Sequence, residues 1–462
     1  MKIYNTLTKS KDEFKSIEKN KIRMYSCGPT VYMFAHIGNL RTYIFNDLMR
    51  RTLKYLGYDV KHVMNITDVG HLLSDADEGE DKMIKASREQ KKSPWEIAEY
   101  YTKIFLEDID SLNIERPEII CKATEHINEM IEFVEGLIDK GYGYELEDGI
   151  YYDVSKFKGY GKLSGNSLEE QLAGARVEVN EGKRHPADFA LWKKASKEHI
   201  MQWQSPWGMG FPGWHIECSA MSRKYLGDQF DIHTGGVDAI PIHHENEIAQ
   251  AEGLIGKQPV NFWVHGEFLL VDNGKMSKSL GNTYTIKQLE EKGFEPLAFR
   301  FFCFNAHYRT KLNFTWDGLK SAQVSLDKLR ESVLAHQNGT EKIEEEEIKN
   351  LKNEFAEAVS DDLNIPRAMV VVWSVAKDSR KSKQFRDLLI DFDRVLGLNL
   401  DKVTEKKQEE FSEEIMELVN RRQEARMQKD WKLSDEIRDK LKEFGVAVED
   451  TAEGPKIKRI QC

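Results

Sequence analysis

The fold of this chain is decided by residues 22–66, which read IRMYSCGPTVYMFAHIGNLRTYIFNDLMRRTLKYLGYDVKHVMNI. The run Ile22–Cys27 alternates apolar and polar residues, as a strand does. Apolar residues then recur at helical spacing over Leu40–Leu56, and Gly57 predicts the end of that helix. Val60–Ile66 predicts a second strand. Strand, helix and strand in this order form a βαβ unit, the building block of a doubly wound parallel sheet.

Composition indicates a large soluble protein. A chain of 462 residues is expected to form two to four domains. Its apolar runs are too short to span a bilayer. No apolar segment follows the start Met1–Asn5, so secretion is not indicated. Five cysteines without a Cys-x-x-Cys pair indicate a reducing compartment. We therefore expect a cytoplasmic protein without a membrane segment.

Net charge does not identify the partner. The value of −11 argues against a protein that coats nucleic acid non-specifically. It leaves tRNA open, because RNA binding depends on local basic patches rather than on total charge.

Helix signals organise the rest of the chain. Ser93-Pro94-Trp95-Glu96 combines a cap, a first-turn proline and a capping box, and predicts a helix to about Leu112. Periodicity weakens from Gly143 to about Gly213, which indicates an insertion into the sheet domain. Helices His215–Leu226 and His243–Leu254 then alternate with strands Phe230–His233 and Phe262–Leu270. After about Trp316 the pattern is helical to Leu398, and the last segment predicts two helices and a terminal hairpin.

His36-Ile37-Gly38-Asn39 lies between the first predicted strand and the following helix. This place favours phosphate, because backbone N–H groups and the positive end of the helix dipole point there. Gly38 leaves room for a nucleotide close to the backbone. Four residues alone are a short signal, so an ordinary strand–helix turn stays open.

Lys275-Met276-Ser277-Lys278-Ser279 follows a predicted strand and lies between Gly274 and Gly281. Two lysines on a glycine-flanked loop suit a mobile clamp on a leaving pyrophosphate. A basic surface turn is the alternative interpretation.

Four side chains form a candidate metal site. His243 and Glu247 are four residues apart on one predicted helix, so they project from the same face. Cys218 lies on the preceding helix and Cys27 ends the first strand. Thiolates with imidazole suit zinc, and one carboxylate is acceptable. Buried cysteines that only pack, and His244 and Glu245 as competing ligands, remain alternatives at this point.

These motifs give the chain a resemblance to the cysteinyl-tRNA synthetases, a family of class I aminoacyl-tRNA synthetases. The resemblance runs from the first strand to the C-terminal tail and favours His243 and Glu247 as the ligands. It departs from the family at Asn39, where the family's first signature usually ends in His. Asn39 can donate a hydrogen bond but cannot be cationic.

The resemblance implies a set of site residues for each ligand. It assigns catalytic roles to His36, Asn39, Lys275 and Lys278. It assigns ATP binding to His36, Gly38, Asn39, Gly235, Gly236, Asp238 and Lys278. The walls of the cysteine pocket would be Gly28, Thr30, Thr67, Trp214 and His233, and the metal ligands Cys27, Cys218, His243 and Glu247. Contacts to the tRNA anticodon would come from Arg426, Trp431, Asp435 and Asp450.

The resemblance also implies the architecture and the partners. We expect an α/β, Rossmann-like catalytic domain over 1–315, with an insertion at about 115–213 and a signature-loop region at about 265–315. A helical bundle over 316–400 and a small α+β anticodon-binding domain over 401–462 would follow. The expected ligands are one Zn²⁺ per chain, Mg²⁺ with ATP, L-cysteine and tRNA(Cys), and the chain is expected to be a monomer.

Two other functions stay open for the sequence. One is a ligase with a similar core that passes activated cysteine to a small amine, which has no use for an anticodon-like tail. The other is a catalytically dead, zinc-bearing RNA-binding protein, which the intact signature at Lys275–Ser279 opposes.

Overall fold

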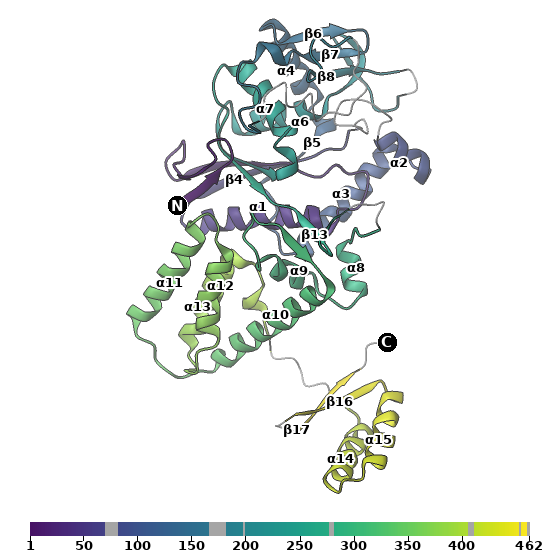
Figure 1. The fold of residues 1–462 in the computed structure, drawn as a ribbon, viewed down its shortest axis with the longest axis vertical. Coiled ribbons are helices and arrows are strands. Elements are labelled where there is room, and N and C mark those ends of the chain that lie inside the picture. Colours follow the sequence, from purple (N-terminus) through teal and green to yellow (C-terminus); the bar gives the residue numbers. More distant parts are fainter. Residues whose placement is uncertain are drawn as a thin grey trace. The chain divides into compact units, whose positions relative to one another are not determined.

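The computed structural model describes residues 1–69, 82–165, 182–196, 199–276, 281–404, 411–451 and 454–459 (Figure 1). Lys278 and the acidic stretch Asp75–Asp81 lie outside these described residues. The chain divides into two compact units, Met1–Val403 and Thr404–Cys462. Across the described parts, we find no helix that is both long enough and apolar enough to cross a membrane.

The centre of the first unit is a five-stranded sheet in which every neighbouring pair is parallel. The strand order is β12-β11-β3-β4-β5. The strands are β3 (Lys21–Ser26), β4 (Asp59–Ile66), β5 (Ile119–Lys122), β11 (Phe230–Gly236) and β12 (Val260–Gly266). The chain therefore adds β4 and β5 on one side of β3, and later adds β11 and β12 on the other side. The predicted Rossmann-like sheet is confirmed.

This strand order creates a switch point between β3 and β11. Connections leave these two neighbouring strands in opposite directions, which opens a crevice at their carboxyl ends. The backbone N–H of Cys27, just after β3, donates to the carbonyl oxygen of Thr234 at 3.3 Å. The carboxyl ends of both strands therefore lie side by side at the place where such sheets bind ligands.

Helix α1 (Ile37–Tyr55) joins β3 to β4, as the sequence predicts. His36 is its N-cap, and Leu40 and Ile44 are buried in the hydrophobic core. Helix α2 (Lys82–Gln90) and helix α3 (Pro94–Ser111) follow β4. The predicted capping box is confirmed, because the Ser93 side chain accepts from the backbone N–H of Glu96.

A second, antiparallel sheet lies within the segment that separates β5 from β11. Its strand order is β6-β7-β8-β10-β9, over Gly143–Leu146, Gly149–Tyr152, Phe189–Lys194, Gly208–Pro212 and Trp203–Ser205. The sequence assigned about 115–213 to an insertion, yet β5 pairs with β4 in the parallel sheet, so the antiparallel sheet itself begins at Gly143. Buried residues of this sheet share one core with α4 (Ile127–Asp139), α6 (Trp214–Leu226) and α7 (His243–Ile255), and Figure 1 shows these elements together.

The prediction of one strand over Phe262–Leu270 is wrong. β12 ends at Gly266, and β13 (Leu269–Val271) belongs to a different sheet with β14 (Gly274–Lys275) and β15 (Leu312–Phe314). The chain breaks at Glu267 and Phe268, whose carbonyl oxygens turn toward the guanidinium of Arg41 on α1. A side chain far away in sequence therefore interrupts a run that reads as continuous.

At the start of the first unit, β1 (Lys2–Asn5) and β2 (Ser10–Glu13) form a small antiparallel sheet, and most of the unit after β14 is helical. Helices α8 to α13 cover Ile286–Glu291, Pro296–Cys303, Trp316–Gln337, Glu345–Ser360, Ile365–Ala376 and Lys383–Leu396. Helix α11 begins within the acidic run at 344–347.

A buried arginine joins these helices to the sheet domain. Arg300 of α9 is fully buried and donates to the Asp47 carboxylate of α1 at 2.6 Å. The same guanidinium donates to the carbonyl oxygen of Leu396 at 2.7 Å and to that of Leu112 at 3.1 Å. A buried charge needs this complete set of partners, because breaking such a pair leaves the remaining charge without compensation.

The second unit has its own small core. Helices α14 (Glu413–Met427) and α15 (Trp431–Glu443) pack with the antiparallel hairpin of β16 (Val446–Thr451) and β17 (Gly454–Arg459). The two predicted helices and the terminal hairpin are confirmed.

Candidate active site and metal centre

The four predicted metal ligands meet at the switch point of the parallel sheet. The Sγ atoms of Cys27 and Cys218 are 4.0 Å apart, and Cys27 Sγ lies 3.9 Å from Glu247 Oε1. His243 Nε2 lies 3.0 Å from the same carboxylate oxygen. One potential ligand atom from each residue falls within 4.8 Å of the others. Three segments that are distant in sequence therefore supply one cluster.

The spacing of these atoms fits a tetrahedral zinc ion. A Zn–S bond of about 2.3 Å places two sulfurs of one tetrahedron about 3.8 Å apart, close to the 4.0 Å between Cys27 and Cys218. Zn–N and Zn–O bonds near 2.1 Å place those ligand atoms about 3.4 Å apart, against 3.0 Å for His243 and Glu247. Two sulfurs, one imidazole and one carboxylate are donors that zinc accepts.

A second, overlapping set shares Cys27 and Glu247 but adds His233 and His244. His244 Nε2 lies 3.2 Å from Cys27 Sγ, so the residue that the sequence named as a competitor does border the cluster. Its Nδ1 lies 2.8 Å from His265 Nε2. The set with Cys218 has two sulfurs, the softer donors, and is therefore the better candidate for zinc.

The cluster is electrostatically coupled through Glu247. Burial raises the pKa of this carboxyl group, but the neighbouring His233 and His243 outweigh burial and lower it to about 2. Burial likewise opposes the charged form of His243, yet Glu247 and Cys218 raise its pKa to about 10. A hydrogen bond from Cys27 and the nearby His243 lower the pKa of Cys218 to about 7. One thiol of the pair is therefore prepared for ionisation.

Two supporting histidines were missed by sequence reasoning. His215 Nδ1 lies 2.9 Å from His243 Nδ1, and His265 contacts His244 as well as the Thr6 hydroxyl. A metal-binding histidine is oriented by the hydrogen bond of its other ring nitrogen, which is the place that His215 occupies for His243. Residue spacing in the sequence does not indicate either histidine, because each contacts a partner on a different secondary-structure element.

The residues expected to bind cysteine line the same end of the sheet. The backbone N–H of Gly28 donates to Asn65 Oδ1 at 2.7 Å, and a Cβ at this position would lie 1.6 Å from the Asn65 carbonyl oxygen. Only glycine therefore fits next to Cys27. Thr30 and Thr67 form an isolated bridge between the segments that follow β3 and β4. The Thr67 hydroxyl is held by a 2.8 Å hydrogen bond to buried Glu217.

The other two expected pocket residues contact the metal cluster itself. The Trp214 ring lies 4.7 Å from the His243 ring, centroid to centroid. His233 Nε2 donates to Glu247 Oε2 at 2.8 Å, and Trp263 stacks on its ring. Trp214 and His233 therefore border the candidate ligands, while Thr30 and Thr67 lie after the carboxyl ends of β3 and β4.

The first signature is a reciprocal cap on α1. His36 Nδ1 accepts from the backbone N–H of Asn39, and Asn39 Oδ1 accepts from the backbone N–H of His36. The N–H of Ile37 donates to the carbonyl oxygen of Tyr284 at 2.8 Å. The backbone N–H groups of His36, Ile37 and Asn39, which lie where a phosphate was expected, are therefore engaged within the protein.

The second signature lies next to the first. A Cβ on Gly38 would lie 3.4 Å from the Cε atom of Met276, the second residue of the signature. Lys275 belongs to β14, while Lys278 falls outside the described residues. Met276 therefore fixes the start of the signature loop at the N-terminus of α1.

The expected ribose turn spans the last residues of β11 and the short 3-10 turn Val237–Ala239 that follows it. A Cβ on Gly236 would lie 2.2 Å from Asp238 Oδ1, and one on Gly235 would lie 2.6 Å from His244 Cε1. Both glycines therefore permit a close approach, one to Asp238 and one to the edge of the metal cluster.

Comparisons with known proteins identify the family. Residues 13–324 match the family described as "tRNA synthetases class I (C) catalytic domain", and residues 408–455 match the "Cysteinyl-tRNA ligase anticodon binding domain". The chain is 46% identical to cysteine–tRNA ligase of Treponema denticola over 98% of both chains. The chain belongs to the cysteine–tRNA ligase family.

One further relative agrees with this assignment, and a solved structure shares the fold. Cysteine–tRNA ligase 1 of Burkholderia lata is 46% identical over 98% of this chain and 96% of its own length. Mycobacterium tuberculosis methionyl-tRNA synthetase in complex with methionyl-adenylate has a TM-score of 0.57 at 13% identity. That likeness covers 82% of this chain and 90% of the other, and it concerns the fold alone. This member of the cysteine–tRNA ligase family therefore has the class I fold.

In this family member, the expected anticodon residues lie on the second unit. The guanidinium of Arg426 lies over the Trp431 ring at 5.5 Å, and Trp431 is 56% exposed. Asp435 forms a 3.1 Å ion pair with Arg438. Asp450 belongs to β16, and its side chain lies outside what the structure describes. Arg426 and Trp431 are therefore brought together, whereas Asp435 has a partner within its own helix.

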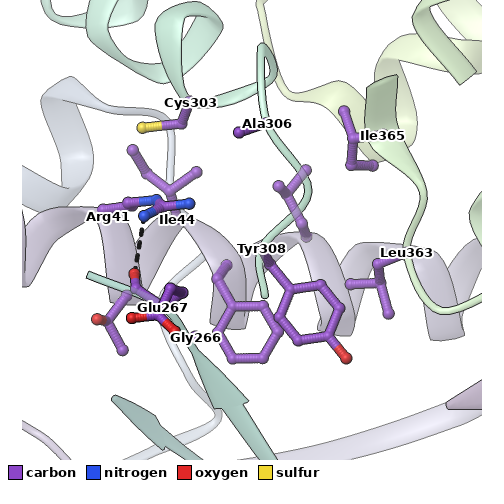
Figure 2. A pocket seen from close by; sticks show the side chains of 12 residues that line it. Arg41, Ile44, Gly266, Glu267, Cys303, Ala306, Tyr308, Leu363 and Ile365 are labelled. Atoms are coloured by element: carbon purple, nitrogen blue, oxygen red, sulfur yellow. Dashed lines mark hydrogen bonds between the residues drawn. The ribbon is translucent and has the colours of Figure 1, made fainter. Parts of the chain in front are cut away.

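Arg41 connects the two signatures of this cysteine–tRNA ligase family member. It lies two residues after Asn39, and its guanidinium donates to the carbonyl oxygens of Glu267 at 2.8 Å and Thr310 at 2.6 Å. Figure 2 shows the bond to Glu267 in a pocket that Cys303 and Tyr308 also line. The guanidinium thus fixes the start of the hairpin that leads into the signature loop.

Replacing Arg41 with lysine should lower the rate of amino-acid activation about tenfold while leaving the KM for cysteine nearly constant. Lysine keeps the charge but cannot reach several carbonyl groups at once, so the loop shifts relative to α1. Steady-state ATP–pyrophosphate exchange measures both constants. Arg116→Lys is the control, because Arg116 is half-exposed and paired with Asp110. Equal effects of the two substitutions would contradict a positioning role.

Proposed function

We propose that this chain activates L-cysteine with ATP and transfers it to the 3′ end of tRNA(Cys), with a zinc ion held by Cys27, Cys218, His243 and Glu247 that selects the substrate thiol. The observation that carries this proposal is the convergence of these four side chains at the switch point of the sheet. Membership of the cysteine–tRNA ligase family supports the reaction.

The first step needs no nucleophile from the protein. The cysteine carboxylate attacks the α-phosphate of ATP in line, and pyrophosphate leaves. Catalysis then consists of positioning and of charge stabilisation in a site prepared for the transition state. We assign His36 and Lys278 to the phosphates, with Mg²⁺ accompanying ATP. Gly235, Gly236 and Asp238 would hold the ribose. A terminal ribose hydroxyl of the tRNA then attacks the adenylate.

Selection against serine is the main demand on this site. The two amino acids differ by one atom, and an apolar pocket separates such near-isosteres by only about 1–3 kcal/mol. A bound zinc ion lowers the pKa of a coordinating thiol and prefers soft sulfur to a neutral hydroxyl. The residues around it, Thr67 and Trp214 among them, would hold the rest of the substrate. We propose that serine is rejected here without hydrolytic proofreading.

The decisive experiment is ATP–pyrophosphate exchange with each amino acid, followed by charging of a total tRNA pool. Exchange with cysteine alone and charging of one tRNA are expected. Exchange without charging would indicate a different acceptor, such as a small amine, whereas the match of residues 408–455 to an anticodon-binding domain favours tRNA. No exchange with any amino acid would overturn the proposal.

Removing the second unit should separate the two half-reactions. A chain that ends at Val403 keeps every described metal, cysteine and ATP residue named above, so cysteine activation should stay within about twofold. Charging should fall at least about tenfold in kcat/KM for tRNA, since stacking of an anticodon base on Trp431 and its neighbour Arg426 is lost. Exchange and charging assays on the same preparation measure both. A parallel loss of both activities would make this unit a structural part of the core.

A further inference from the structure

A small group of aromatic side chains borders the active site and has no role in the proposed reaction so far. Phe34 lies on the segment between β3 and α1, and Tyr100 lies on α3. Phe34 is 43% exposed and Tyr100 is 40% exposed. Their ring centroids are 6.3 Å apart, with an angle of 71° between the planes. Two large rings thus reach solvent side by side.

The buried Tyr101 ring supports both exposed rings. Phe34 packs edge-on against the buried Tyr101 ring, with centroids 5.0 Å apart and planes at 84°. Tyr100 also contacts Tyr101 at 5.1 Å. A supported ring loses little conformational freedom when a ligand stacks on it, which favours binding.

A cation lies next to these rings. Lys92 Nζ lies 4.8 Å from the centroid of the Tyr100 ring. The Glu96 carboxylate on the same helix as Tyr100 is engaged with Ser93 at the start of α3. This combination of exposed rings and a cation attracts a phosphate backbone and stacks its bases.

We infer that Phe34, Tyr100 and Lys92 form a stacking site for the unpaired nucleotides at the 3′ end of the tRNA. Rings of this kind stack on bases that are free of a duplex, and the acceptor end is the unpaired part of the tRNA that must enter the active site. Phe34 lies two residues before His36, on the same segment as Cys27 and Gly28. A base on this platform therefore lies next to the reaction that consumes the terminal hydroxyl.

This inference rests on the proposed function, and its test separates the two. The dissociation constants of the full-length protein are measured for a tRNA(Cys) transcript and for the same transcript without its unpaired 3′ nucleotides. The natural protein should bind the shortened transcript about tenfold more weakly. Phe34→Leu and Tyr100→Leu should reduce this ratio to nearly one, while Phe34→Tyr, which keeps a ring, should preserve it. The two dissociation constants of each ratio are measured on the same preparation. Partial unfolding of a variant therefore changes both by the same factor and cancels in the ratio.

Charging assays extend the test. In Phe34→Leu, transfer to tRNA should fall about tenfold more than cysteine activation does. Equal affinity of the natural protein for both transcripts, or an unchanged ratio in both leucine variants, would overturn the inference while cysteine activation and tRNA charging still support the proposed function. A natural protein that neither activates cysteine nor binds tRNA would instead overturn the proposed function.

Discussion

Replacing Cys218 with serine is expected to remove the metal ion and lower cysteine activation by at least about a hundredfold. Serine supplies a neutral, hard hydroxyl where the cluster has its most acidic thiol, with a pKa lowered to about 7. Loss of groups that merely orient zinc ligands already costs 10–100-fold in affinity or activity. Loss of a ligand should therefore cost more. ATP binding at His36 should largely survive, because that residue caps a different element.

Metal content is the direct measurement of this effect. The natural protein should hold about one zinc per chain after dialysis, and Cys218→Ser well below that. Cys303→Ser is the matched control, since Cys303 is also buried but lies in the pocket of Figure 2, among residues that are not metal ligands. Zinc retained by the Cys218 variant, absence of zinc from the natural protein, or serine activation followed by rapid adenylate hydrolysis would each contradict the proposed selection.

Replacing Lys278 with alanine should slow adenylate formation by about 10²–10³-fold with little change in cysteine affinity. The charge that grows on the departing pyrophosphate exists mainly in the transition state, so its loss appears in kcat rather than in binding. Lys278 lies outside the described residues, but the start of its loop is fixed by Met276 against α1 and by Arg41 against Glu267.

Single-turnover adenylate formation, with cysteine and ATP varied separately, tests this role. Lys287→Ala provides the control, because Lys287 is an exposed lysine of the following helix α8. A Lys278 variant with normal rates would exclude this lysine from the mechanism. A variant with normal rates only at saturating cysteine would place it in ground-state binding instead.

Sequence patterns predicted the elements whose signals are local. The capping box at Ser93 and the helical spacing after His36 both describe contacts within a few residues, and the structure confirms both elements. The break between β12 and β13 could not be predicted, because Arg41 imposes it from a residue more than 220 positions away. The local pattern thus predicted a strand in this region, whereas the contact with Arg41 determined where β12 ends.

The candidate metal centre likewise combines local patterns with tertiary contacts. The spacing of His243 and Glu247 predicted a shared helix face, and the resemblance to the family favoured this pair over His244 and Glu245. The approach of His244 to Cys27, at 3.2 Å, and the support of His243 by His215 depend on how α7 packs against β3 and α6. Such packing has no signature in residue spacing.

Arg300 has a consequence for how this sequence can change over evolutionary time. One guanidinium serves Asp47, Leu396 and Leu112, which belong to three distant segments. A substitution at Arg300 would leave these carbonyl groups without their buried donor, although Asp47 would keep its 2.8 Å bond from Arg51. A substitution at Asp47 would leave the buried guanidinium with carbonyl partners alone. Descendants of this chain can therefore replace much of its surface one residue at a time, whereas a change at Arg300 or Asp47 disturbs several segments at once.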